Sequence, residues 1–215
     1  MSSAISSSIA IDDLVRQRFE GIYLSTKEAN ANVSHSYDIS KHIEALKQEL
    51  HYNLESLKDN QIVRAYRDFY WRIGIDPTKT RPASEALLRR FLKNQTLPKI
   101  NNVVDAGNIA SVKTLVPIGL YDMNNIMGEL KLRFARNGDQ FTDITGSIET
   151  LQGNEVVLAD ESGILHLFPH RDSQRTMIND DTKKILIVGC GVPNVPRSRV
   201  DVAAEDVVSI LGELR

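Results

Sequence analysis

Three polar residues, Arg171, Asp172 and Ser173, follow the apolar run Leu167-Phe168 and are the first candidates for chemistry in this chain. The end of a strand is where the rim of a binding pocket often lies, because connecting loops carry many of the residues that bind ligands. The Arg171 guanidinium is suited to a phosphate or a carboxylate, and an ordinary surface pair between Arg171 and Asp172 is the alternative. We expect Phe168, Arg171, Asp172 and Ser173 to contribute to a substrate site.

Thiol and imidazole groups offer a second kind of chemistry. Cys190 lies between two glycines, with no helix N-terminus or base near it in sequence to activate the thiol, so we interpret it as a structural cysteine. His166 and His170 are four residues apart, but they flank a strand end, and no Cys or Glu completes a metal-ligand set. The glycine-rich nucleotide-binding motifs and the serine-hydrolase motif are absent. We predict no metal site and no cofactor.

Asn108 is a polar residue in a segment that otherwise predicts a buried helix ending before Pro117. It lies four residues after Val104 and is therefore on or beside the apolar stripe of that helix. An amide in such a place costs free energy unless it is hydrogen-bonded. Either it bonds a nearby backbone group, or it faces a cleft beside the next strand, where Gly107 and Gly119 leave room.

Basic side chains are concentrated between Arg64 and Lys99. That span holds nine basic and three acidic residues, whereas the whole chain holds 26 basic and 28 acidic residues. A basic face on an acidic body can neutralise phosphates and orient the end of an RNA molecule. A solvated helix face without a ligand is the alternative. The residues that we expect to bind RNA are Arg81, Arg89, Arg90, Lys93 and Lys99.

The composition indicates a soluble globular protein. The chain has 215 residues, of which 41% are hydrophobic and 25% charged, and its formal net charge is −2. A single cysteine excludes an internal disulfide and fits a cytoplasmic location. The first ten residues lack the features of a signal peptide, and no run of about 18 apolar residues is present, so we expect no membrane contact.

The N-terminal half predicts mainly helices, because its apolar residues recur at spacings of three and four. The expected elements are a strand over Leu14–Leu24, a loop over Ser25–Ser36, a helix from Asp38 or Ser40 to Leu57, a helix from Asp59 or Asn60 to Tyr70, and a helix over Ser84–Lys93 whose apolar side includes Ala86.

The C-terminal half predicts mainly strands, because apolar and polar residues alternate or form short apolar runs between turn residues. The expected strands are Ile118–Tyr121, Glu129–Arg136, Glu155–Ala159, Ile164–Phe168 and Lys184–Val188, with a hairpin turn at Asn137-Gly138 and a final helix over Val202–Leu214. Helices first and strands afterwards favour an α+β fold, with sheets layered on helices, over a doubly wound sheet.

A resemblance to a known family is carried by RPASEALLRR at 81–90, NNVVD at 101–105 and PIGLYD at 117–122. These stretches resemble the B3/B4 domain of the phenylalanyl-tRNA synthetase beta subunit, which hydrolyses mischarged tyrosyl-tRNA. Arg171-Asp172-Ser173, Arg175-Thr176 and Thr182 resemble free-standing members of the family. The resemblance covers residues 17–190. It implies a single domain over 1–215, with 1–16 as an N-terminal extension and 191–215 as a C-terminal loop and helix.

The resemblance also implies a pocket. The synthetase uses a Thr-Asn pair whose positions read Gly107-Asn108 here, so the asparagine is kept. Its histidine, two residues after a proline, corresponds to Gly119 after Pro117, and its glutamate on the last strand falls near Val188. The implied substrate site therefore includes Gly107, Asn108, Pro117 and Gly119. Because the catalytic module of the synthetase is absent, we expect no aminoacylation by this chain alone.

Three functions fit these features. We favour a free-standing editing hydrolase that binds the acceptor end of tRNA and releases a wrong amino acid. Ester hydrolysis of this kind needs a positioned water molecule and hydrogen bonds more than a protein nucleophile. A non-catalytic RNA-binding module would explain the missing histidine and glutamate. The third function is that of a small-molecule-binding protein that kept the pocket and changed its ligand.

Overall fold

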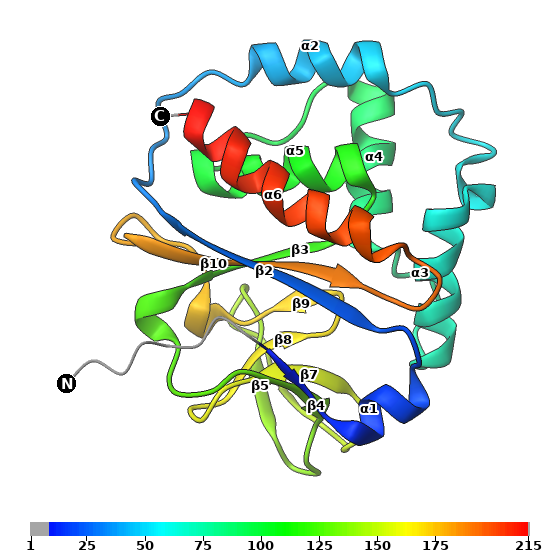
Figure 1. Ribbon diagram of the computed structural model, residues 1–215, viewed down its shortest axis with the longest axis vertical. Coiled ribbons are helices and arrows are strands. Elements are labelled where there is room, and N and C mark those ends of the chain that lie inside the picture. The colour runs from blue at the N-terminus through cyan, green and yellow to red at the C-terminus, as the bar shows by residue number, and fades with distance from the viewer. Residues whose placement is uncertain (1–8, 215) are drawn as a thin grey trace.

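The computed structural model describes residues 9–214 and arranges them in an α+β fold (Figure 1). The helices are α1 (Asp13–Arg18), α2 (Ser40–Glu49), α3 (Gln61–Arg72), α4 (Ala83–Asn94), α5 (Asn102–Thr114) and α6 (Arg197–Glu213). Short 3-10 helices cover Leu57–Asp59 (η1), Met123–Asn125 (η2) and Gln174–Thr176 (η3). Most helices precede most strands in the chain, which confirms the predicted α+β class.

The strands form three sheets. They are β1 (Ala10–Ile11), β2 (Tyr23–Asn30), β3 (Ile118–Asp122), β4 (Lys131–Phe134), β5 (Gln140–Thr142), β6 (Ile148–Thr150), β7 (Val156–Ala159), β8 (Ile164–Leu167), β9 (Arg171–Asp172) and β10 (Lys184–Gly191). The sheet orders are β2-β10-β3, β1-β4-β7-β8-β9 and β5-β6. A strand from the N-terminal part of the chain and one from the C-terminal part are neighbours here, because β2 and β10 pair antiparallel along their whole length.

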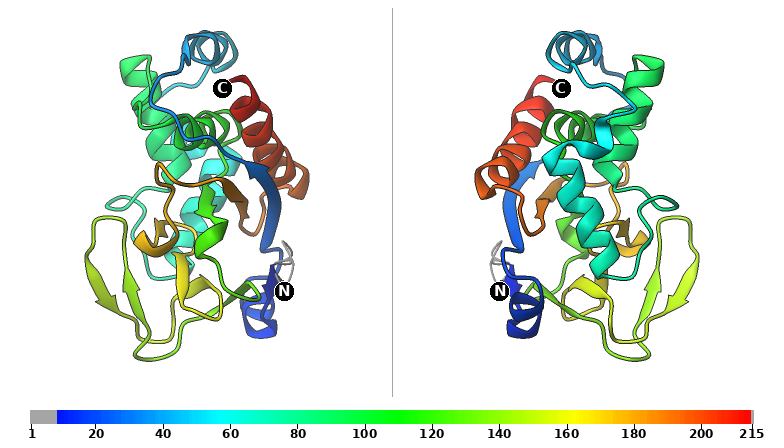
Figure 2. Two further views of the ribbon diagram at one scale, coloured as in Figure 1. Left: turned by 90° about the vertical axis from the view of Figure 1, so that its left-hand side faces the viewer. Right: turned by 90° about the vertical axis from the view of Figure 1, so that its right-hand side faces the viewer.

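The sheets and helices are stacked in layers. Helices α5 and α6 lie on one face of the β2-β10-β3 sheet, and the five-stranded sheet lies beyond its other face (Figures 1 and 2). Helix α6 packs very closely on β10, because a Cβ built on Gly189 would lie 2.8 Å from the Val200 carbonyl oxygen. No described helix has the length and apolar character that a membrane-spanning helix needs.

Helix α5 lies at the centre of the helical layer and is bounded by specific residues. The Asn101 side chain accepts a hydrogen bond from the backbone N–H of Val104 at 2.9 Å, which caps the first turn. Leu115 adopts a left-handed conformation with φ of 62° and ends the helix shortly before Pro117. The helix is therefore fixed at both ends, and its buried faces pack against α4, α6 and β3.

The predictions for the first 57 residues are partly wrong. Leu14–Leu24 was expected to be a strand, but it contains most of α1, and β2 occupies much of the expected loop Ser25–Ser36. The pairing of β2 with β10 decides this, and such a non-local contact cannot be read from local propensity. Residues 1–8 of the expected N-terminal extension lie outside the described residues. Of the rest, β1 pairs with β4, and Val15 is buried in the core.

The helix expected to reach Leu57 ends at Glu49. Beyond it, the Leu54 carbonyl accepts a hydrogen bond from Arg89 Nη1 at 2.9 Å instead of continuing an intrahelical ladder. Helix α4 is also rotated relative to the prediction. Ala86 is exposed, and Glu85 is completely buried beside two arginines.

The hairpin predicted at Asn137-Gly138 is a turn, with φ of 92° at Gly138, but it does not join paired strands. Strand β4 pairs with β1 and β7, whereas β5 pairs with β6. The turn residues were identified correctly, and the partner of β4 was set by the sheet rather than by the turn. At the C-terminal end, β10 extends past Val188 to Gly191, and α6 begins at Arg197 rather than Val202.

Candidate functional site

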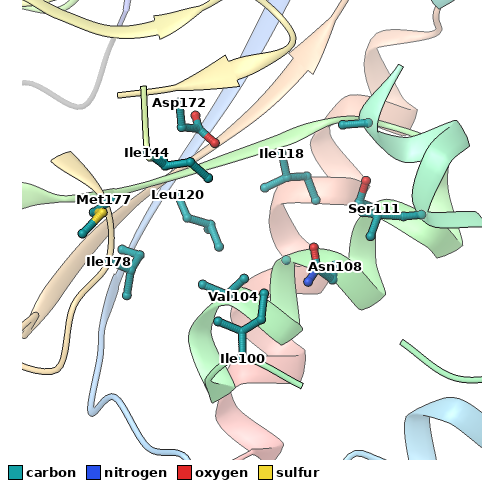
Figure 3. Close-up of a pocket in the computed structure, with 13 residues that line it drawn as sticks. Ile100, Val104, Asn108, Ser111, Ile118, Leu120, Ile144, Asp172, Met177 and Ile178 are labelled. Atoms are coloured by element: carbon teal, nitrogen blue, oxygen red, sulfur yellow. The ribbon is translucent and has the colours of Figure 1, made fainter. Parts of the chain in front are cut away.

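A cavity of about 410 Å³ lies between the helical layer and the loops of the second sheet. Helices α4 and α5 and strand β3 form most of it, and residues from the β5–β6 connection, β9 and the segment after η3 close it (Figure 3). The lining residues are Ala83, Leu87, Ile100, Val104, Gly107, Asn108, Ser111, Ile118, Leu120, Ile144, Asp172, Met177 and Ile178.

The lining is mainly apolar, with three polar side chains, Asn108, Ser111 and Asp172. Figure 3 shows Asn108 projecting from α5 and Asp172 from the opposite side, with Ile118 and Leu120 between them. Ile144 remains 57% exposed at the rim, although it is a large apolar side chain. An apolar cavity with a few polar groups is the usual form of a site for a small organic group.

Gly107 gives the cavity part of its width. A Cβ built at this position would lie 2.8 Å from Leu120 Cδ1, so a larger residue would force the Leu120 side chain to move. Asn108, the next residue on α5, is half-buried and makes no side-chain hydrogen bond to another described residue. Its amide is therefore available to a ligand, and of the two alternatives left open by the sequence the cleft-facing one fits these contacts.

Asp172 is the one ionisable side chain among the described lining residues. Its Oδ1 atom is buried and has no hydrogen-bond partner among residues 9–214. Burial raises the pKa of the Asp172 carboxyl to about 7, although the neighbouring Tyr121 hydroxyl opposes this shift. The carboxyl therefore changes its charge near neutral pH, in the range where acid–base groups operate.

Tyr121 and His166 form a buried polar pair behind Asp172. The Tyr121 hydroxyl and His166 Nδ1 are 2.9 Å apart, and His166 pairs with Asp172 in the ladder between β8 and β9. Burial lowers the pKa of His166 to about 3, so the imidazole is neutral at physiological pH. Burial likewise raises the pKa of Tyr121 well above its ordinary value, so the phenol keeps its proton.

The positions that the resemblance assigns to a histidine and a glutamate lie outside the cavity lining. A Cβ on Gly119 would lie 2.1 Å from the Tyr121 hydroxyl oxygen, so Tyr121 fills the space that a larger residue would need. Val188 is fully buried in β10, in register with Gly119. The polar groups nearest this region are instead those of Tyr121, His166 and Asp172.

The structure brings together some of the expected substrate-site residues and separates others. Gly107, Asn108 and Asp172 line the cavity. Phe168 packs in the core against Phe69, with ring centroids 5.9 Å apart, and buried Ser173 caps η3.

Arg171 points away from its neighbour Asp172. It forms an ion pair with Glu149 and lies over the Phe141 ring, with its guanidinium carbon 5.4 Å from the centroid. The alternative of a surface pair between Arg171 and Asp172 is therefore not formed, and Arg171 pairs with Glu149 of β6 instead.

Sequence reasoning missed several lining residues. Ser111 and Leu120 are on elements that were predicted correctly, but their orientation depends on how α5 packs against β3. Ile144 and Met177 are large apolar residues in otherwise polar loop segments, and this unusual composition could have indicated in the sequence that they line a pocket. They lie far apart in sequence, so only the folded chain brings them to one rim.

A second, basic cleft of about 300 Å³ lies along α4. It is lined by Arg81, Ala86, Arg89, Arg90, Lys93 and Asn94. Arg90 and Lys93 are exposed, whereas Arg89 Nε donates to buried Glu85 at 2.7 Å. Lys99 lies apart from this cleft and donates to the Tyr37 carbonyl at 2.9 Å.

The alternative chemistries find little support in the described residues. Within residues 9–214, no group of three or more His, Cys, Asp and Glu side chains is arranged to hold a metal ion. Cys190 is fully buried, and burial raises the pKa of its thiol, which fits the structural interpretation of this residue.

Comparison with known proteins points to one family. A family model described as "B3/4 domain" matches residues 65–209. Phenylalanine–tRNA ligase beta subunits match about half of the chain: that of Mycoplasma genitalium is 27% identical over 113 residues, covering 52% of this chain and 14% of the relative. That of Nitrobacter winogradskyi is 31% identical over 109 residues, covering 51% of this chain and 13% of the relative. The chain thus spans a small part of these relatives' length.

A solved structure was also similar. It is an N-terminal fragment of the phenylalanyl-tRNA synthetase beta subunit from Pyrococcus horikoshii, with 15% sequence identity and a TM-score of 0.49. The alignment covers 100% of this chain and 51% of that one.

Proposed function

Since this chain belongs to the B3/4 domain family, we propose that it binds the acceptor end of a mischarged tRNA and hydrolyses the ester bond that holds the wrong amino acid. The cavity would receive the amino acid, and the basic cleft would receive phosphates of the RNA. The relatives that match about half of this chain are phenylalanine–tRNA ligase beta subunits. Editing by this chain outside a ligase is part of the proposal.

The observation that carries the proposal is that α4 contributes side chains to both sites. Ala83 and Leu87 of this helix line the apolar cavity, while Arg90 and Lys93 line the basic cleft. A helix is only about 10 Å across, so an RNA strand that crosses α4 can reach both sites at once. Electrostatic binding in the cleft would hold the RNA, and the cavity would select the amino acid.

The chemistry proposed for the cavity is direct attack of water on the ester carbonyl carbon. Its lining includes no Ser-His-Asp arrangement, and the Cys190 thiol is buried away from it. The Asn108 amide can donate a hydrogen bond to the substrate, because no described residue uses it. Preorganised donors of this kind stabilise the charge that develops on the carbonyl oxygen.

The test is the release of labelled amino acid from a panel of mischarged tRNAs. We expect at least one of them to be hydrolysed faster in the presence of the protein than in buffer. If none is, the deacylase proposal fails, and the RNA-binding function without catalysis becomes the better one. The panel should include aliphatic and aromatic amino acids, because nine of the lining residues are apolar.

The RNA-binding half of the proposal has its own test. Replacing Arg90 and Lys93 together by Gln should weaken tRNA binding and reduce the slope of log affinity against log salt by about 0.7–0.9 for each phosphate that the protein no longer neutralises. Arg89 is left in place because it neutralises Glu85. The control replaces Lys131 of β4 and the exposed Arg136 by Gln, which removes the same charge from the layer of the five-stranded sheet, away from α4 (Figure 1). Equal salt slopes in the two double variants would refute a role for the cleft.

The apolar character of the cavity also favours a second candidate, the binding of a free small molecule. That function predicts that a ligand binds to the cavity while tRNA does not bind at physiological salt. A filter-binding measurement at that salt concentration separates the two, because the deacylase proposal requires tRNA to bind.

A further inference from the structure

Asp172 is placed unusually for a carboxylate at the edge of a sheet. It ends the short strand β9, pairs in register with His166, and faces a cavity whose other described lining residues carry no ionisable group. Its Oδ1 atom is buried and unpaired in the described part of the chain. A buried oxygen without a partner costs free energy, so its presence calls for an explanation such as a ligand or a catalytic role.

The groups around the Asp172 carboxyl are neutral at physiological pH. Tyr121 of β3, Cys190 of β10 and His166 of β8 are the titratable side chains that face it, and burial favours the uncharged form of each. The nearest cation along the strand, Arg171, is engaged by Glu149. Because no positive charge among residues 9–214 stabilises its ionised form, the carboxylate is a stronger base than an exposed aspartate.

We propose that Asp172 is the general base of the cavity and takes a proton from the water molecule that attacks the ester carbonyl carbon. This inference rests on the proposed deacylase function. As the new carbon–oxygen bond forms, one proton of the water passes to an Asp172 carboxylate oxygen. The tetrahedral intermediate then collapses, the bond between the carbonyl carbon and the ribose oxygen breaks, and Asp172 returns the proton to the leaving oxygen. The products are the free amino acid and a tRNA with its terminal hydroxyl restored.

Two features of the cavity suit this role. The apolar side chains of Ile118, Leu120 and Ile144 surround the carboxylate and limit the access of bulk water, which strengthens local electrostatic interactions (Figure 3). The carboxyl pKa of about 7 leaves a large ionised fraction at physiological pH while keeping the base strong. The Asn108 amide lies on the other side of the cavity and can contact the carbonyl oxygen while Asp172 contacts the water.

The experiment measures single-turnover hydrolysis of the substrate identified in the panel, between pH 5 and pH 9. In the wild-type protein the rate should rise with pH and level off above about 7. Asp172→Asn should be slower by about 100-fold or more at pH 8, since general bases contribute factors of that size. The variant should also lose the rise near pH 7, while its Kd for the aminoacyl-tRNA changes less than about threefold, far below that catalytic loss. Asp181→Asn, an exposed change of the same charge, is the control and should behave like the wild type.

A second variant guards against a purely structural effect. Asp172→Ala should be as slow as Asp172→Asn, and added formate should restore part of its rate in a saturable way, because formate supplies a carboxylate to the space left behind. A structural role predicts no recovery with formate, so the lack of recovery in a folded variant would overturn the proposal.

The remaining outcomes separate this inference from the proposed function. If Asp172 instead binds the α-ammonium group of the substrate, Asp172→Asn will raise Kd strongly, and this loss of affinity will disappear with N-acetylated aminoacyl-tRNA. That result would refute the role of Asp172 as general base. If the wild type is active and Asp172→Asn is equally active, the general-base role of Asp172 is refuted, whereas the deacylase function is retained. If the wild type hydrolyses none of the substrates, both fail.

Discussion

Replacing Asp172 by Asn should stabilise the folded protein at alkaline pH. The carboxyl has a pKa of about 7 in the folded chain, because burial penalises its charged form, whereas an ordinary aspartate has a value of 3.8. Ionisation therefore costs the folded state more than the unfolded state. Asparagine has nearly the same shape as aspartate but carries no charge, so the folded variant does not bear the free-energy cost of a buried charge.

The sign and size of the effect follow from the two pKa values. Below about pH 4 the carboxyl is protonated in both states and costs nothing. As the pH rises towards 7, the unfolded chain releases its proton first, so the wild-type protein loses stability, and above 7 the loss is constant. A difference of about 3 pH units corresponds to an upper limit of about 4 kcal/mol. Because Asp172 is only half-buried, solvent reduces this, and we expect about 2 kcal/mol.

The assay is thermal unfolding of the two proteins from pH 4 to pH 9. A gain of about 2 kcal/mol should raise the Tm of Asp172→Asn by about 4–8 °C at pH 8, and the difference should shrink towards pH 4. Asp181→Asn, which removes an exposed carboxylate, should show no such trend. If Asp172→Asn is less stable than the wild type at pH 8, or if the difference does not depend on pH, the carboxylate is stabilised in the folded protein and the reasoning is wrong.

Three further predictions concern single residues. Burial alone would raise the pKa of Glu85, but hydrogen bonds from two arginines outweigh it and lower the pKa, so Glu85→Ala should cost about 3–5 kcal/mol at pH 7 by urea unfolding. That loss should fade as the pH drops below about 4, where the unfolded carboxyl is protonated. Asn108→Ala should change the free energy of unfolding by less than about 0.5 kcal/mol, because no described residue loses a hydrogen bond, yet should slow hydrolysis at least about tenfold. Gly107→Ala should displace Leu120 into the cavity and weaken binding of the largest amino acids in the panel, measured as a rise in KM, with little change in Tm.

The cost of removing Glu85 corrects a simple reading of the basic segment. The sequence suggests that Arg89 belongs to a free basic face, but its side chain neutralises the buried carboxylate and bonds the Leu54 carbonyl. Helical periodicity identified α4 and its ends, yet it put Ala86 inside and did not identify Glu85 as buried. The buried Glu85 is stable because Arg67 of α3 reaches it in addition to Arg89 of its own helix, and a local pattern contains only the second of these partners.

The same limit applies to the candidate site. Gly107 and Asn108 were candidates because the resemblance assigns a pocket Thr-Asn pair to these positions, and because an amide on an apolar helix face needs a hydrogen-bond partner. Asp172 was a candidate as part of a polar run after a strand, but its neighbour Arg171 looked equally suitable. Their different surroundings come from β6 and β8, which pair or pack beside them only in the folded chain.

By itself the sequence determined the α+β class, the approximate boundaries of α3 and α4, the existence of α5 and its end before Pro117, and the strand β3. These depend on hydrophobic periodicity, capping residues and prolines that act within a few positions. Tertiary structure alone decided that β2 pairs with β10 and that β4 pairs with β7 rather than with β5. It also decided that Tyr121 fills the space beside Gly119. It decided as well that the Asp172 side chain faces the cavity and that its Oδ1 atom is unpaired in the described part of the chain. Strand pairing and desolvation depend on atoms that are distant in the chain, so local residue types cannot specify them.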